Sequence, residues 1–137
     1  MRYAIMLCSL ALAVTLCRAE LIVTPSAPKI TGNKTVVTLG LKNTFAQPIE
    51  SARAIVFLLD EKGKMVGQST KWVIGGGKDA PKMAAGATNI FNFVITSAEP
   101  LTSTNLTAKV SFSRVVLEGG KLTNPSKEVT VEQSKNN

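Results

Sequence analysis

The chain has 137 residues, of which 45% are hydrophobic and 18% charged, and its formal net charge is +7. This composition excludes a disordered tail or a long helical rod, and the length suits one domain rather than two. The sequence contains no histidine, and its two cysteines, Cys8 and Cys17, lie in the first 19 residues. The rest of the chain therefore lacks the usual nucleophile–base pairs and every soft metal ligand except methionine.

Residues 1–19 have the pattern of an export signal. Arg2 gives a positive start, residues 3–16 are almost wholly apolar, and Cys17-Arg18-Ala19 offers small residues before a cleavage site. The apolar run is short for a bilayer-spanning helix, which needs about 20 residues. We expect cleavage before Glu20, a periplasmic or extracellular location, and no transmembrane segment in the mature protein. Cys17 leaves lipid anchoring as a less favoured alternative, because Leu16 precedes it.

Residues 20–132 are expected to form a single all-β domain, followed by a disordered tail at 133–137. Helical periodicity is nearly absent after the leader, and β-branched and aromatic residues gather in short runs bounded by turn residues. Hairpin turns are predicted at 60–64 and 118–121, and a bulge near Arg114. About seven strands are predicted, near 21–24, 34–43, 50–59, 65–74, 88–95, 104–117 and 129–131. This pattern is typical of a β-sandwich like those of immunoglobulin or fibronectin type III domains, with a small barrel as the alternative.

Three segments resemble the FxLYD-type domains, which are bacterial secreted or lipid-anchored β-sandwiches related to the immunoglobulin-like folds. They are NTFAQP at 43–48, VFLLDEKGKMVG at 56–67 and MAAGATNIFNF at 83–93. Leu59 stands where the family prefers tyrosine, and Ala85 where proline usually precedes the turn glycine. The resemblance covers about residues 34–117 and implies a β-sandwich, but it implies no common ligand or reaction.

No residue pattern predicts catalysis or metal binding. The adjacent carboxylates Asp60-Glu61 fall in a predicted turn, which the aspartate is expected to cap. Asp79 stands alone between lysines, which does not suit calcium. The run Gly75-Gly76-Gly77-Lys78 lacks the helix and the Lys-Ser/Thr pair of a phosphate-binding loop, so it is interpreted as a flexible connection. The sequence therefore predicts a non-enzymatic protein without a cofactor.

Positive charge is scattered along the chain rather than gathered in a stripe. Removal of Arg2 and Arg18 with the leader lowers the formal net charge from +7 to +5. Nucleic-acid binding is not expected, and the charge suits solubility or weak attraction to an anionic envelope. We expect a monomer that recognises a protein or glycan of the cell envelope. The alternative is a structural or assembly domain that associates through its edge strands.

Trp72, the only tryptophan, has two interpretations. In the favoured one it shares a strand face with Val66 and Ile74 and fills the core, as a strand tryptophan does in immunoglobulin domains. In the other it lies on the outer face beside a polar loop at 75–86 and forms a shallow site for an anionic glycan or peptide. The tentative ligand-binding residues of this second interpretation are Lys71, Trp72, Lys78 and Lys82.

Overall fold

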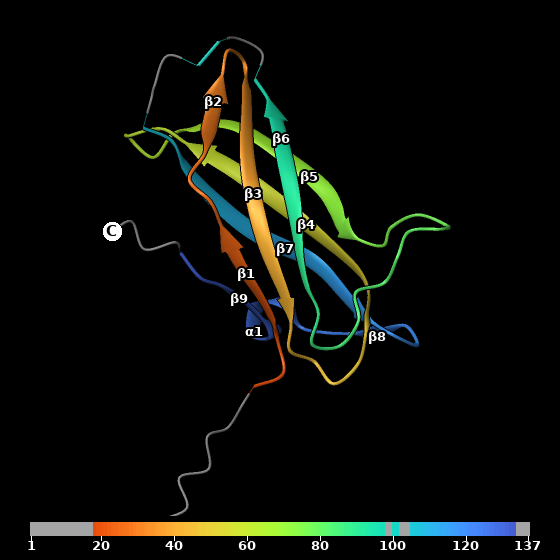
Figure 1. The fold of residues 1–137 in the computed structure, drawn as a ribbon. Coiled ribbons are helices and arrows are strands. Elements are labelled where there is room, and N and C mark those ends of the chain that lie inside the picture. Colours follow the sequence, from red (N-terminus) through yellow and green to blue (C-terminus); the bar gives the residue numbers. More distant parts are fainter. Residues whose placement is uncertain (1–17, 98–99, 102–104, 134–137) are drawn as a thin grey trace, which may run out of the picture.

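A computed structural model describes residues 18–97, 100–101 and 105–133. Its strands are β1 (Leu21–Pro25), β2 (Lys29–Thr31), β3 (Lys34–Asn43), β4 (Ile49–Leu59), β5 (Met65–Ile74), β6 (Thr88–Thr96), β7 (Thr107–Leu117), β8 (Lys121–Leu122) and β9 (Val129–Val131), with one short helix, α1 (Pro125–Glu128) (Figure 1). All the predicted strands are present, and β2 and β8 are short additions. Most of the predicted leader and the tail beyond residue 133 lie outside the described residues.

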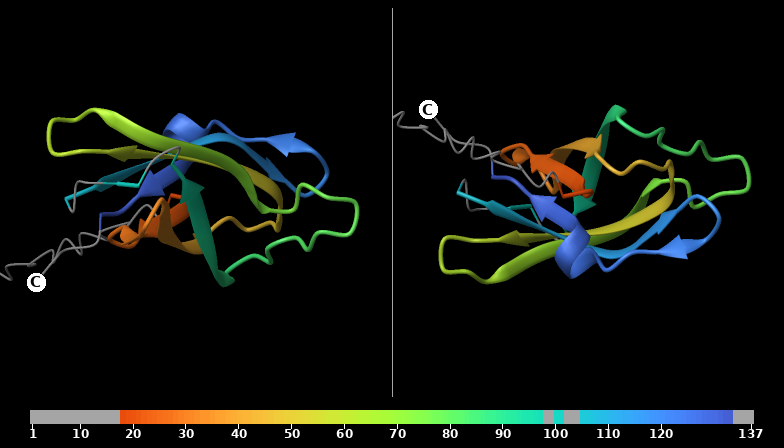
Figure 2. Two further views of the ribbon diagram at one scale, coloured as in Figure 1. Left: turned by 90° about the horizontal axis from the view of Figure 1, so that it is seen from above. Right: turned by 90° about the horizontal axis from the view of Figure 1, so that it is seen from below.

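The strands form two sheets that pack face to face (Figure 2). In the first sheet, here called sheet A, β3 is central: it pairs with β6 on one side and with β1 and β2 on the other, and β9 joins β1 in parallel. In the second, sheet B, the order is β5-β4-β7-β8. The expected all-β sandwich is confirmed. Strand β6 forms one edge of sheet A, and β5 forms one edge of sheet B.

The core lies between the sheets. It is formed by the side chains on one face of each long strand, because successive side chains of a strand point to opposite sides. Its fully buried side chains come from both sheets and include Leu21, Val23, Val37, Leu39, Val56, Leu58, Phe93, Ile95 and Val115. Strand β4, which is apolar at most positions, lies between β5 and β7.

The predicted bulge near Arg114 is present. In the pairing of β4 with β7, Arg53 lies opposite Arg114 and Ala54 lies opposite Phe112. Ser113 is therefore an extra residue on β7, which shifts the register between the two pairs. Downstream of Ser113 the side chains change faces, so Val115 is buried.

A second bulge, which the sequence does not reveal, lies near the end of β5. Ala52 of β4 pairs with Ile74, and the next residue, Arg53, pairs with Trp72. Val73 is therefore the extra residue on β5. Because one extra residue reverses the faces of the residues beyond it, Ile74 points into the core and Trp72 points out of it.

Asn43, at the end of β3, ties two connecting segments together from a fully buried position. Its side-chain Nδ2 donates to the carbonyl oxygens of Gln47, Met83 and Ala84 at 3.1, 3.2 and 3.1 Å. Its Oδ1 accepts the N–H of Phe45 at 2.9 Å. A buried amide with its groups satisfied fixes a local geometry strongly, so Asn43 positions the loop that leads from β5 into β6.

Within the described part of the chain, no helix combines the length and apolar character needed to span a bilayer.

Candidate functional site

Trp72 lies on the outer face of sheet B, and 39% of its surface is exposed. The favoured interpretation, a core tryptophan on the same face as Val66 and Ile74, is therefore wrong. The physical reason is the bulge at Val73, which gives the inward position to Ile74, whose exposure is 4%.

The glycines that follow β5 hold the loop against the indole. Gly76 has a φ of +90°, and a Cβ atom placed on it would lie 2.3 Å from Cγ of Trp72. Gly75 has a φ of +60°, and its Cβ would lie 2.2 Å from the carbonyl oxygen of Glu50. Only glycine fits both the dihedral angles and the space. This stretch is therefore a close-packed support for Trp72, whereas the sequence suggested a flexible connection.

A hollow of about 380 Å³ lies between Trp72, this loop and the start of β4. Its volume is at the small end of the range for ligand pockets. Three of the four predicted ligand-binding residues, Trp72, Lys78 and Lys82, line it. The remaining lining residues are Glu50, Ser51, Gly75, Gly76, Gly77 and Ala80.

Lys71 does not belong to this hollow, which corrects the prediction. It precedes Trp72 on β5, so its side chain leaves the opposite face of the strand. Its Nζ donates to the carbonyl oxygen of Val94 at 3.4 Å and lies 5.8 Å from the centroid of the Phe93 ring. Lys71 therefore bridges the two sheets at the β5 and β6 edges.

One arginine that the sequence did not single out lies beside Trp72, and a second lies one strand further away. The guanidinium carbon of Arg53 is 5.8 Å from the centroid of the indole ring, which is within cation–π range. Arg114 is the cross-strand partner of Arg53 on β7. Alternation along β4 could have placed Arg53 outward, because Ala52 and Ala54 flank it. Its position beside Trp72, however, depends on strand pairing.

Two of the three charged residues that line the hollow are positive. Lys78 and Lys82 line it, Arg53 covers part of the indole, and Glu50 is the one carboxylate among the lining residues. Lys82 also forms an ion pair with Glu118 at 3.8 Å. Exposed pairs of this kind are worth about 0–1 kcal/mol, so an anion could readily compete for this ammonium group.

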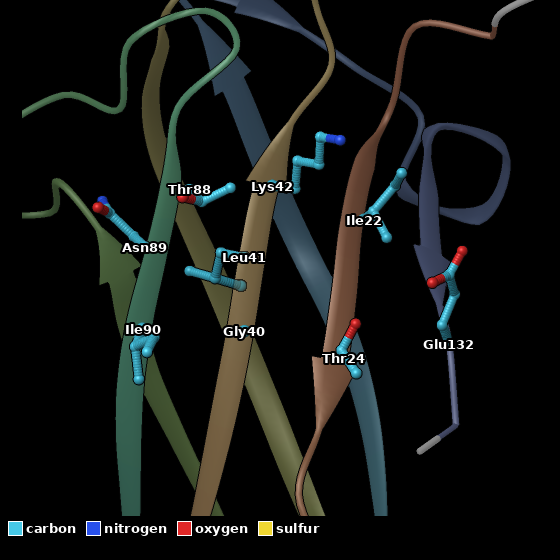
Figure 3. A pocket seen from close by; sticks show the side chains of 9 residues that line it. All are labelled: Ile22, Thr24, Gly40, Leu41, Lys42, Thr88, Asn89, Ile90 and Glu132. Atoms are coloured by element: carbon cyan, nitrogen blue, oxygen red, sulfur yellow. The ribbon is translucent and has the colours of Figure 1, made fainter. Parts of the chain in front are cut away.

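A larger hollow of about 810 Å³ lies on the outer face of sheet A (Figure 3). Its floor is Gly40, which lacks a side chain, and its walls include Ile22 of β1 and Ile90 of β6. Lys42 and Glu132, which carry opposite charges, also line it. It contains no aromatic side chain and no excess of one charge, so it lacks the recognition features gathered at Trp72.

The carboxylates show no metal-binding arrangement in the part of the chain that the structure describes, where no three potential histidine, cysteine, aspartate or glutamate ligands come together. Asp60 caps its hairpin turn, as predicted: its Oδ1 accepts the N–H groups of Lys62 and Lys64 at 2.9 and 2.8 Å.

No protein-family model and no curated protein sequence matches the chain. Among solved structures, the chain is similar to the ApaA protein of Bordetella pertussis, with 17% identity and a TM-score of 0.53 over 77% of this chain and 88% of that one. A structural genomics target, SoR45, aligns with 15% identity and a TM-score of 0.46 over 77% and 76% of the two chains. A β-glucuronidase of glycoside hydrolase family 2 aligns over 79% of this chain but 10% of its own, with 18% identity and a TM-score of 0.39. The likeness to ApaA supports the β-sandwich fold and carries nothing about function.

Proposed function

We propose that this protein is an exported, non-enzymatic binding domain of the cell envelope, and that the hollow beside Trp72 binds an anionic glycan. The observation that carries the proposal is the exposed indole held by Gly76 and Arg53 at the edge of a hollow lined by Lys78 and Lys82.

An exposed indole suits a sugar because it offers an apolar face together with a polar N–H group. Lysine and arginine side chains around it supply charge-assisted hydrogen bonds to a carboxylate. The facing pair of Arg53 and Arg114 adds to this argument. Like charges directly opposite on neighbouring strands are destabilising, and a bound anion near them would relieve that repulsion.

The residues of the hollow support binding rather than catalysis. A glycosidase normally uses two carboxyl groups that flank the scissile bond. Glu50 is the single carboxylate among the residues that line the hollow. The chain also contains no histidine that could serve as a general base.

Export is supported by the place where the folded domain begins. Arg18 and Ala19 are exposed, whereas Glu20 is half-buried. The N–H of Glu20 donates to Oγ1 of Thr44 at 2.9 Å, and its carbonyl oxygen accepts the N–H of Thr44 at 3.0 Å. A cleavage before Glu20 would therefore leave the domain intact.

Isothermal titration calorimetry tests the proposal with three probes: a tetrasaccharide of galacturonic acid, the neutral tetrasaccharide cellotetraose and a hexaglutamate peptide. We expect saturable binding of the acidic tetrasaccharide and at least tenfold weaker binding of the other two. Tighter binding of hexaglutamate would indicate a site for acidic peptides instead.

Variants locate the binding. Trp72→Ala should abolish it, and the double variant Lys78→Gln/Lys82→Gln should weaken it at least about tenfold, which corresponds to about 1.4 kcal/mol. The matched control is Lys62→Gln/Lys64→Gln, which removes the same charge from the exposed turn between β4 and β5 and should bind normally. Unchanged binding by Trp72→Ala would refute the assignment.

A further inference from the structure

We propose that β6 is a dimerisation strand, along which two copies of this chain join their A sheets by antiparallel pairing about Asn92. This interaction surface lies on the other sheet from the Trp72 hollow and is independent of glycan binding.

The open side of β6 has unpaired backbone groups. Among the described residues, β6 pairs with β3 alone. At one end of this pairing the N–H of Asn43 donates to the carbonyl oxygen of Ala87 at 3.0 Å, and at the other the N–H of Ser97 donates to that of Asn33 at 2.7 Å. Because backbone groups alternate sides along a strand, the odd-numbered residues of β6 face β3. The even-numbered residues, 88 to 96, turn their N–H and C=O groups to the open edge.

This edge lacks the usual internal protection against pairing. Exposed edge strands are commonly protected by charged side chains, proline or bulges. The sequence of β6, TNIFNFVIT, contains no charge and no proline. Its register with β3 runs without a shift from Lys34 opposite Thr96 to Lys42 opposite Thr88. Strand β6 is therefore a nine-residue edge strand without a bulge in its pairing with β3 and without a charged residue of its own.

The outward residues of β6 read nearly the same in both directions, with Ile and Val exchanged. In order they are Thr88, Ile90, Asn92, Val94 and Thr96, so an antiparallel copy centred on Asn92 places Thr opposite Thr, Ile opposite Val and Asn opposite Asn. Cross-strand pairs of β-branched side chains stabilise sheets. Ile90 and Val94 are 75% and 39% exposed. In the dimer, Ile90 of each copy would pack against Val94 of the other, so this apolar contact would form twice. This self-complementarity makes a second copy the occupant, since a two-fold interface uses the same patch on both chains.

One side chain from the other sheet reaches this edge. Lys71 donates to the carbonyl oxygen of Val94 at 3.4 Å in an exposed hydrogen bond. A carbonyl oxygen has two lone pairs, so this contact and a backbone bond to the second copy are compatible. Strand β5 also approaches β6 where Gly67 faces Ile95, but Ile95 points into the core and leaves the edge free.

The distribution of charged residues is consistent with this dimer interface. The mature chain is expected to be basic, but β6 contributes no charged side chain of its own to the interface, and the Lys71 ammonium group that reaches Val94 belongs to β5. The monomer expected from the sequence would then be the state at low concentration.

Sedimentation equilibrium of the purified protein tests the proposal, and we expect a monomer–dimer equilibrium. Asn92→Lys and Asn92→Glu each place like charges opposite each other at the two-fold axis. Each variant should raise the dimer dissociation constant at least about tenfold, and mixing the two should restore dimers because opposite charges then meet. Asn92 is exposed and accepts one hydrogen bond from Thr38, so the monomer should stay folded, which circular dichroism verifies. The control Thr70→Lys adds a charge to an exposed position on β5 and should leave the dimer unchanged.

Three results would overturn the proposal. The first is a wild-type protein that stays monomeric up to its solubility limit, as it would if the edge instead accepted a strand of another protein. The second is an Asn92→Lys variant that dimerises as tightly as the wild type. The third is a mixture of the two variants that forms no dimers.

Discussion

The contact between Gly76 and Trp72 gives the sharpest single-residue prediction. Replacing Gly76 by alanine places a Cβ atom 2.3, 2.6 and 2.7 Å from Cγ, Cβ and Cδ2 of Trp72. Carbon atoms in contact are normally about 3.5–4.0 Å apart, so the loop or the ring must move by about 1 Å or more. Gly76→Ala should therefore displace the indole from the position that forms the hollow.

The expected loss of stability has two parts. A side chain in the left-handed backbone region costs about 1–2 kcal/mol, and forcing an extra carbon into an occupied space costs about 1–3 kcal/mol. Gly76→Ala should therefore lower the free energy of unfolding by about 2–5 kcal/mol. Gly63 is the matched control: its φ is +78°, but no atom lies within 4 Å of its hypothetical Cβ. Gly63→Ala should therefore show only the backbone cost of about 1–2 kcal/mol.

Urea unfolding followed by circular dichroism measures both free energies. Acrylamide quenching of the single tryptophan then reports where the indole lies, because a displaced ring changes its accessibility. Quenching should change in Gly76→Ala and stay at the wild-type level in Gly63→Ala. Equal loss of stability in the two variants, together with unchanged quenching, would refute the packing of this loop against Trp72.

Three further predictions concern the scaffold. Asn43→Ala should lower the free energy of unfolding, measured with urea, by about 3 kcal/mol, because it leaves a buried N–H and several carbonyl groups unpaired. The control Asn89→Ala, at an exposed position, should change this free energy by no more than about 0.5 kcal/mol. EDTA and reductant should each leave the melting temperature unchanged. A shift of several degrees with either reagent would contradict a domain that is stabilised by its hydrophobic core without a metal ion or a disulfide. Mass spectrometry of the exported protein should give a chain that begins at Glu20, and a product that retains Cys17 with added lipid would contradict the predicted cleavage.

The long strands could be predicted because their side chains alternate over many residues. The predicted bounds of β3 and β5 agree with the structure. Strands β2 and β8, with three and two residues, are too short for any periodicity to stand out.

The candidate site was less predictable because it depends on register. One extra residue, Val73, decides which of Trp72 and Ile74 enters the core, and nothing in the local sequence marks it. The error at Lys71 was avoidable, since neighbouring residues of a strand point to opposite faces. Arg53 could be placed beside Trp72 only once the pairing of β4 with β5 was known.

The central claim, that an anionic glycan binds beside Trp72, is tested most directly by two-dimensional ¹H–¹⁵N NMR of the labelled protein titrated with the galacturonic acid tetrasaccharide. We predict saturable shifts of the Trp72 indole N–H and of the backbone amides of residues 75–78, with the amides around Gly40 and along β6 unchanged. Shifts centred on the Gly40 hollow, or no shift at the Trp72 indole at saturating probe, would contradict the account.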